Sequence, residues 1–158
     1  MDTPLQSLTA LLLERQLVIA TAESCTAGLV AKLLTDQAGS SQWFERGFVT
    51  YSNVAKQEML GVAADTLAQS GAVSQQAVTA MASGALANSR ANVALAISGI
   101  AGPDGGTPDK PVGTVWFAWV NDAGRAQQSM QIFPGDRQAV REQAAAYAIQ
   151  GMLDFLND

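Results

Sequence analysis

Two apolar runs decide the fold of this chain: VALAI at residues 93–97 and GTVWFAWV at residues 113–120. Neither run contains a charged residue, and uninterrupted apolar runs of this length are typical of strands that are buried on both faces of a sheet. The second run leads through NDAG, at residues 121–124, into a more polar segment at residues 127–133. This pattern predicts a β-hairpin, and because a hairpin pairs antiparallel, any sheet that contains it together with parallel strands is mixed.

Outward from these runs, strands alternate with helices along the chain. Further strands are predicted over residues 17–22 and 47–51, and helices over residues 24–34, 53–60 and 74–89. Thr3, Pro4 and Gln6 form a capping-box pattern that begins a first helix, and Asp136 begins a terminal one. The alternation favours an α/β fold: a three-layer α/β/α sandwich with a mixed, mostly parallel sheet of about five strands. We expect a single domain over residues 1–158.

The composition excludes several kinds of chemistry. The chain has 158 residues and no histidine, which excludes a Ser-His-Asp triad, a histidine-bound metal and an imidazole base. A single cysteine, Cys25, excludes an internal disulfide. The formal charge of −5 argues against nucleic acid and anionic membranes as partners. With no targeting signal at the N-terminus and no metal-ligand cluster, we expect a cytoplasmic protein without a metal site.

The first candidate segment is TAESCTAG at residues 21–28, where a predicted strand passes into a predicted helix. Ser24 and Thr26 would offer hydroxyls, and Ser24, Cys25 and Thr26 would offer free backbone N–H groups, to an anionic ligand at a helix start. Alternatively, Ser24 or Thr26 is only a helix N-cap, and Cys25 is only a small buried apolar residue.

The second candidate segment spans residues 39–56 and contains Ser41, Tyr51 and Lys56. Lys56 is expected in the first turn of a helix, where the positive end of the helix dipole disfavours a charged amine. To act as a base near neutral pH, its pKa must fall from about 10.4 to about 7, which requires burial as well. The alternative is a solvated surface lysine beside a packed aromatic ring.

The third candidate segment is a long loop over residues 99–113, with five glycines and three prolines. It begins with Gly99 at the end of a buried strand, which is where open α/β sheets bind ligands. It matches neither the dinucleotide-binding nor the P-loop glycine pattern. Asp104 and Asp109 in this loop are either metal ligands or solvated acids.

The last candidate pair, Arg137 and Arg141, stands four residues apart near the start of the terminal helix. Residues at this spacing lie on the same face of a helix, and two arginines placed there can bind a phosphate. The alternative is a solvated helix face with Asp136 as its cap.

Taken together, residues 21–28, 39–56, 97–119 and 135–148 resemble the C-terminal domain family of competence/damage-inducible protein A. The resemblance covers nearly the whole chain and implies a three-layer α/β/α fold with a mixed sheet. It also implies hydrolysis of nicotinamide mononucleotide to nicotinic acid mononucleotide and ammonia, in pyridine-nucleotide recycling. The resemblance implies a homodimer, and it implies no cofactor.

The resemblance further implies a serine–lysine type of amide hydrolysis, which suits a chain without histidine. By position, Ser41 matches the nucleophile, Tyr51 the relay and Lys56 the base, with Ser24 the next candidate for the nucleophile. The substrate-binding segments are matched by Ser24, Cys25, Thr26, Gly99 and Arg141, and Arg137 is added from the phosphate-grip pattern.

Two other functions stay open at this point. The same pocket would serve a catalytically silent nucleotide-binding or regulatory module, although such a module has no need of a neutral lysine. Metal-dependent nucleotide hydrolysis through Glu23 and Asp104 is the other reading.

Overall fold

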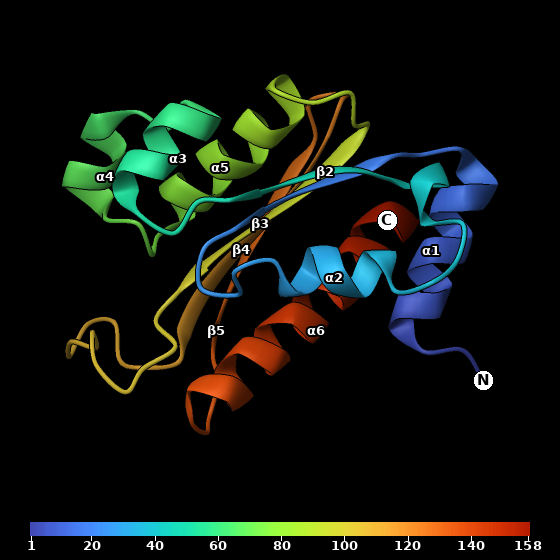
Figure 1. Ribbon diagram of the computed structural model, residues 1–158. Helices are drawn as coiled ribbons and strands as arrows, with labels where there is room; N and C mark the ends of the chain where they lie inside the picture. The colour runs from blue at the N-terminus through green and yellow to red at the C-terminus, as the bar shows by residue number, and fades with distance from the viewer.

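The computed structural model describes residues 1–158 and consists of a five-stranded sheet between two layers of helices (Figure 1). The strands are β1 (Ile19–Glu23), β2 (Phe44–Val49), β3 (Val93–Gly99), β4 (Thr114–Asn121) and β5 (Ala126–Ile132). They lie side by side in the order β2-β1-β3-β4-β5. Strand β1 pairs parallel with β2 and β3, whereas β4 pairs antiparallel with β3 and β5. The predicted hairpin, mixed sheet and three-layer sandwich are therefore confirmed.

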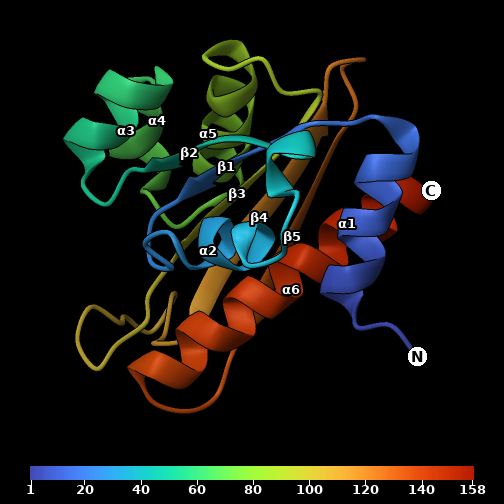
Figure 2. The ribbon, with the colours of Figure 1, turned by 45° about the vertical axis from the view of Figure 1, so that its right-hand side comes forward.

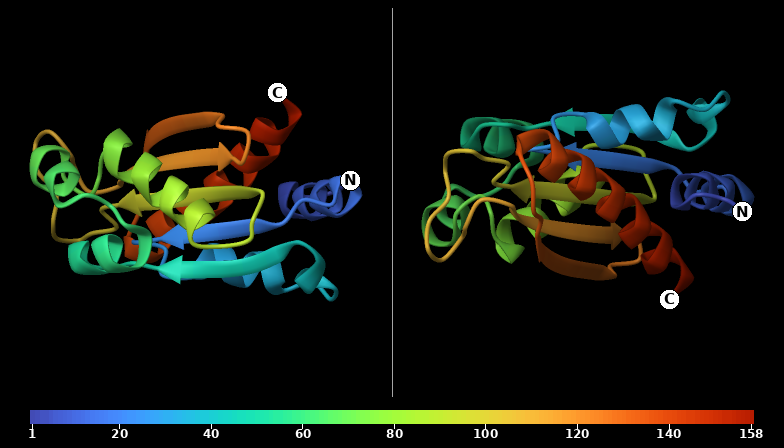
Figure 3. Two further views of the ribbon diagram at one scale, coloured as in Figure 1. Left: turned by 90° about the horizontal axis from the view of Figure 1, so that it is seen from above. Right: turned by 90° about the horizontal axis from the view of Figure 1, so that it is seen from below.

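The helices form the two outer layers (Figure 3). They are α1 (Pro4–Arg15), α2 (Leu29–Thr35), α3 (Asn53–Leu60), α4 (Ala64–Ser70), α5 (Gln75–Ala87) and α6 (Arg137–Asn157), with a 3-10 turn, η1 (Ser40–Gln42). Helices α3, α4 and α5 lie on one side of the sheet, and α1, α2 and α6 on the other. None of these helices combines the length and the hydropathy needed to cross a bilayer.

Each face of the sheet has its own core because successive side chains of a strand point to opposite faces. On β3, Leu95 enters a core that α1, α2 and α6 complete, while Ala94 and Ala96 enter the core under α5. The second core is lined mainly by alanine and valine from both the sheet and α5. These small side chains let α5 lie close against the sheet, which fixes the position of α3 and α4 beyond it.

Helix α2 begins at Leu29, so the prediction of a helix over residues 24–34 is wrong in its first turn. Ala27 and Gly28 have φ angles of 48° and 98°, in the left-handed region, so residues 24–28 form a turn instead. Gly28 occupies the N-cap position and supplies no side-chain cap. The strand therefore reaches the helix through a tight turn that projects from the end of β1.

The cap of α2 comes from the strand that precedes it. The carboxylate of Glu23, the last residue of β1, accepts hydrogen bonds from the backbone N–H groups of Val30 and Ala31 at 2.9 and 3.0 Å. Glu23 is 1% exposed, and a carboxylate at a helix N-terminus is favoured by the helix dipole. Glu23 thus fixes α2 relative to the end of β1.

The carboxyl ends of β1, β2 and β3 meet at one edge of the sheet. Helix α3 follows β2 at this edge, and the loop over residues 100–113 follows β3 there. Both chain termini lie at the other end of the molecule, beside α1 and the end of α6 (Figures 1 and 2). This arrangement gathers three of the four candidate segments at a single edge.

Candidate active site

A cavity of about 200 Å³ opens at the carboxyl edge of the parallel strands. Six of the nine predicted site residues line it: Ser24, Cys25, Tyr51, Lys56, Gly99 and Arg137. The cavity therefore brings together residues from the turn after β1, the segment after β2, the end of β3 and the start of α6. The other three, Ser41, Thr26 and Arg141, do not line it.

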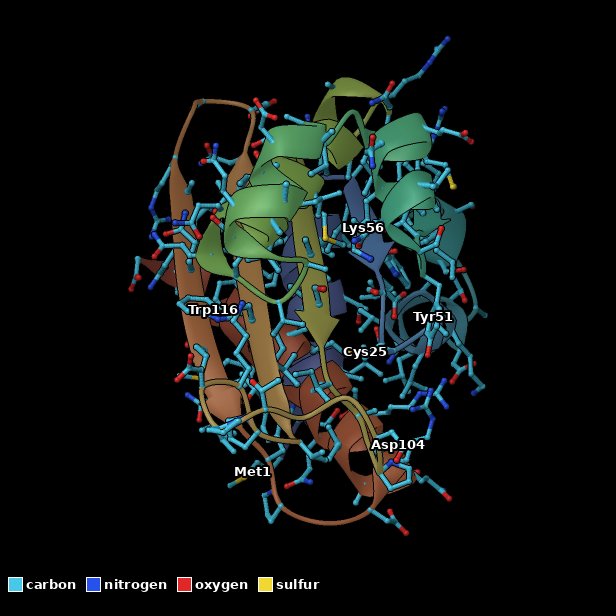
Figure 4. All side chains as sticks on the ribbon, turned by 90° about the vertical axis from the view of Figure 1, so that its left-hand side faces the viewer. Met1, Cys25, Tyr51, Lys56, Asp104 and Trp116 are labelled. Carbon is cyan, nitrogen blue, oxygen red and sulfur yellow. The ribbon has the colours of Figure 1, made fainter.

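Lys56 points inward from α3 and is only 1% exposed (Figure 4). Its Nζ lies 3.0 Å from Ser24 Oγ and donates hydrogen bonds to the carbonyl of Thr50 at 2.8 Å and to the carbonyl of Tyr51 at 3.2 Å. No carboxylate contacts this amine. The alternative of a solvated surface lysine is therefore wrong, and Ser24 is the serine that lies beside the amine.

The surroundings of Lys56 favour its neutral form. Burial lowers the pKa of Lys56, because removal from water penalises the charged amine, and the nearby Cys25 opposes this effect only in part. In its neutral form the amine has two N–H groups, which donate to the two carbonyls, and a lone pair, which can take the proton of Ser24 Oγ. The pair of Ser24 and Lys56 thus has the geometry of an activated nucleophile and its base.

Ser41 lies far from this pair. It is exposed and sits in η1, directly before β2, whereas Tyr51 and Lys56 follow β2. The six residues of β2, at about 3.3 Å each, put about 20 Å between the two ends of the strand. Figures 1 and 3 show η1 and α3 at opposite ends of β2. The predicted proton transfer from Ser41 to Lys56 does not fit this geometry.

Tyr51 meets the pair through its backbone rather than its side chain. Its carbonyl accepts from Lys56 Nζ, and Ser24 Oγ lies 3.5 Å from the same oxygen. Its ring is exposed, and its hydroxyl accepts a hydrogen bond from Arg137 Nη2 at 3.0 Å. The phenol therefore stands at the mouth of the cavity, and the predicted relay through its hydroxyl has no contact with Ser24 or Lys56.

Two side chains hold the turn that carries Ser24. Arg141 Nε donates to the carbonyl of Cys25 at 3.0 Å, and its Nη2 lies 3.5 Å from the carbonyl of Thr26. The hydroxyl of Thr26 donates to Glu23 at 2.6 Å, and Thr26 is fully buried. Thr26 therefore contacts the protein interior instead of the cavity, and Arg141 braces the turn from α6.

Cys25 follows Ser24 but does not act like a nucleophile. It is 4% exposed, and burial raises its pKa to about 11 despite nearby cationic groups. A thiol with this pKa stays protonated near neutral pH, and the protonated form is a poor nucleophile. The structure agrees with the reading of Cys25 as a small buried side chain.

Arg137 and Arg141 share one face of α6, which begins at the N-cap Asp136. They border an open hollow of about 450 Å³ beside the cavity. Arg137 lines both spaces and also donates to the carbonyl of Gly102 at 2.8 Å. Glu142 also lines the hollow, so two arginines and one carboxylate leave it with a net positive charge beside the cavity that holds Ser24 and Lys56.

Sequence reasoning missed Ser98 as a site residue. Ser98 belongs to β3, is 1% exposed and lines the cavity beside Ser24. The available signal was register: Ser24 follows β1 and Ser98 lies near the end of β3, so the parallel pairing of these two strands places them side by side. By contrast, Glu23 and Asp104 do not meet, because Glu23 is buried under α2 and Asp104 is exposed in the loop (Figure 4).

Fold and cavity define an α/β/α domain that presents a serine hydroxyl to a buried lysine amine. The model of the CinA C-terminal domain matches residues 2–156, and the chain belongs to this family. Nicotinamide-nucleotide amidohydrolase PncC of Escherichia coli (strain K12) is 61% identical over 136 residues, which cover 86% of this chain and 82% of that protein.

Two further proteins show the same relationship. Nicotinamide-nucleotide amidohydrolase PncC of Pseudomonas putida is 53% identical over 137 residues, covering 87% of this chain and 85% of its own length. The crystal structure of a competence/damage-inducible protein from Agrobacterium tumefaciens superimposes with a TM-score of 0.91 at 43% identity. That superposition covers 100% of this chain and 98% of the other.

Proposed function

We propose that this chain hydrolyses the carboxamide of nicotinamide mononucleotide to give nicotinic acid mononucleotide and ammonia, with Ser24 as nucleophile and Lys56 as base. The reaction class is supported by the 61% identity to an amidohydrolase named for nicotinamide nucleotides. The observation that carries the mechanism is the 3.0 Å contact between Lys56 Nζ and Ser24 Oγ inside the cavity.

In the first half-reaction, neutral Lys56 takes the proton of Ser24 Oγ while that oxygen bonds to the carboxamide carbon. The π electrons of the carbonyl move onto its oxygen, which gives a tetrahedral intermediate. When this intermediate collapses, the C–N bond breaks, Lys56 returns the proton to the nitrogen and ammonia leaves. The positive charge of the substrate's pyridinium ring draws electrons from the amide and makes its carbon more reactive.

The second half-reaction frees the acid. Lys56, again neutral, takes a proton from water, whose oxygen bonds to the acyl carbon. The bond to Ser24 Oγ then breaks, and the serine oxygen recovers its proton from Lys56. One base thus serves both halves, and neither imidazole nor a cofactor is required.

The two adjoining spaces suit the two ends of a mononucleotide. The cavity of about 200 Å³ takes the pyridine ring with its carboxamide, and the hollow beside it takes the phosphate. An arginine carries five N–H donors, so Arg137 and Arg141 retain donors for a phosphate beyond those bonded to backbone carbonyls.

The direct test measures ammonia from the purified chain with nicotinamide mononucleotide, and identifies the acid product by mass. Free nicotinamide, which lacks ribose and phosphate, serves as the comparison substrate and is expected to react far more slowly. A parallel reaction in excess chelator is expected to run at the same rate. Tight calorimetric binding of the mononucleotide without any ammonia would overturn the proposal in favour of a silent nucleotide-binding module.

A further inference from the structure

Two serines stand side by side on neighbouring parallel strands at the carboxyl edge of the sheet. Glu23 of β1 pairs with Ile97 of β3, so the next residues along the chain, Ser24 and Ser98, are neighbours. The pairing continues to this point, because the N–H of Ser24 donates to the carbonyl of Ile97 at 3.0 Å. Neighbouring strands are about 4.8 Å apart, so the two serine side chains are within reach of one small group.

Both serines face the same side of the sheet. Ala22 and Ala96 enter the core under α5, and side-chain direction repeats every second residue along a strand. Ser24 and Ser98, each two residues further on, therefore point to the side where Lys56 lies. Their shared direction explains why both line the cavity.

The hydroxyl of Ser98 makes no hydrogen bond within the chain, and Ser98 lines the cavity. Ser98 is 1% exposed, and its oxygen faces the cavity. The amine of Lys56, by contrast, is held by Ser24 Oγ and by the carbonyls of Thr50 and Tyr51. A serine hydroxyl that reaches a cavity without a partner in the chain can donate a hydrogen bond to a ligand bound there. The hydroxyl of Ser98 can therefore form a hydrogen bond with a polar ligand atom that lies next to Ser24.

We propose that Ser98 is a catalytic residue whose hydroxyl donates a hydrogen bond to the carboxamide oxygen as Ser24 attacks the adjoining carbon. This inference rests on the proposed function. When the bond from Ser24 Oγ to carbon forms, the carbonyl π electrons move to that oxygen, and the proton of Ser98 stays on Ser98. The hydrogen bond strengthens as the charge develops, so it lowers the barrier more than it tightens substrate binding.

The test compares Ser98→Ala, Ser98→Thr and the control Ser129→Ala by steady-state ammonia release. Ser98→Ala is expected to lose about 100-fold or more in kcat, as for loss of an oxyanion donor, with KM changed by less than about threefold. Ser98→Thr keeps a hydroxyl and is expected to recover most of that loss. Ser129 lies on β5 with its oxygen 2.6 Å from the hydroxyl of Tyr147, outside the cavity, and its variant is expected to keep the rate of the unmodified chain.

A binding measurement separates the catalytic role from a structural one. In the inactive Ser24→Ala background, the affinity for nicotinamide mononucleotide, measured by calorimetry, is expected to change by less than about threefold when Ser98→Ala is added. If that variant does not fold, Ser98→Cys, with a weaker donor of similar size, is expected to show a loss in kcat of at least about tenfold. Thermal melting of each variant reports whether it is folded.

The outcomes also distinguish this inference from the proposed function. If the unmodified chain releases no ammonia, or if Ser24→Ala keeps its rate, the proposed function fails. If the unmodified chain turns over and Ser98→Ala keeps kcat, the proposed function stands and the role of Ser98 is overturned. A rise in KM alone would likewise overturn it, since that result describes a ground-state contact.

Discussion

Ser24 and Ser41 are the same kind of residue in two opposite settings. Ser24 follows β1, is 7% exposed and lies 3.0 Å from a buried amine. Ser41 occupies a single 3-10 turn at the far end of β2 and is exposed. A hydroxyl in water has no base to take its proton, whereas the hydroxyl of Ser24 has one within hydrogen-bonding distance. The surroundings of a serine, and not its residue type, therefore decide whether it can act as a nucleophile.

Removal of each hydroxyl in turn tests this difference between Ser24 and Ser41 directly. Ser24→Ala is expected to lower kcat by about 10⁶-fold, the magnitude observed when a serine nucleophile is removed. Ser41→Ala, measured in the same ammonia assay, is expected to stay within about twofold of the unmodified chain, because exposed turn residues contribute little. Equal losses of kcat in the two variants, or a larger loss for Ser41→Ala, would contradict the assignment of Ser24 as the nucleophile and favour Ser41.

The base gives the next largest effect. Lys56→Met is expected to lower kcat by about 10³-fold, the usual contribution of a general base. In the unmodified chain, kcat/KM is expected to rise with pH until the lowered pKa of Lys56 is passed, and then to level off. A flat profile across that pH range in an active chain would show that Lys56 does not act as the base.

The same amine predicts a dependence of stability on pH, whose sign follows from its lowered pKa. Between that lowered pKa and the value near 10.4 in the unfolded chain, the unfolded state binds more protons at Lys56 than the folded state does. The free energy of unfolding should therefore rise with pH over this window. Lys56→Met removes this contribution, so denaturant melts of the two proteins at several pH values are expected to differ in slope with pH.

A third variant tests what holds Ser24 in place. Glu23→Gln replaces a buried carboxylate that accepts from Thr26 and from two backbone N–H groups of α2. Loss of these charge-assisted hydrogen bonds is expected to lower the free energy of unfolding by about 3 kcal/mol in a urea melt. The matched control is Glu58→Gln, on the exposed face of α3, with an expected change below about 0.5 kcal/mol. Equal changes would mean that Glu23 does not anchor the turn.

The smallest effect is expected from the two arginines of α6. Arg137→Ala is expected to raise KM about tenfold with little change in kcat, because it removes one phosphate donor at the rim of the cavity. Arg141→Ala is expected to lower kcat as well, since Arg141 also braces the turn that carries Ser24. Arg125→Ala is the control, because Arg125 donates to the carbonyl of Phe155 at the other end of α6. Identical kinetics for Arg137→Ala and Arg141→Ala would contradict the bracing role.

Most of the fold could be predicted from local patterns in the sequence. The capping box of α1 forms with both of its hydrogen bonds, and the apolar runs became β3 and β4. The turn before α2 could not be read in this way, because Ala27 adopts a left-handed conformation that its residue type does not signal. Helix α4 was missed because it is short and Ala63, at its N-cap, provides no side-chain cap.

Only part of the candidate site could be predicted from the sequence, for a different reason. Burial and neighbours of Lys56 depend on α5 and the strand ends, which are distant in sequence. Pairing register brings Ser24 and Ser98 together across 74 positions of chain (98 − 24), and no local pattern shows that proximity. The proximity of Ser24 and Ser98 could be predicted from the sequence only by assuming the register in which the two parallel strands pair.

The position of the termini has a practical consequence. Both ends of the chain lie at the end of the molecule remote from the cavity (Figures 1 and 2). A purification tag, a surface linker or a fluorescent fusion attached at either end therefore points away from the mouth through which a mononucleotide would enter. Immobilised or fused forms of this chain should keep an open entrance, so the assays described above can be carried out on a sensor surface as well as in solution.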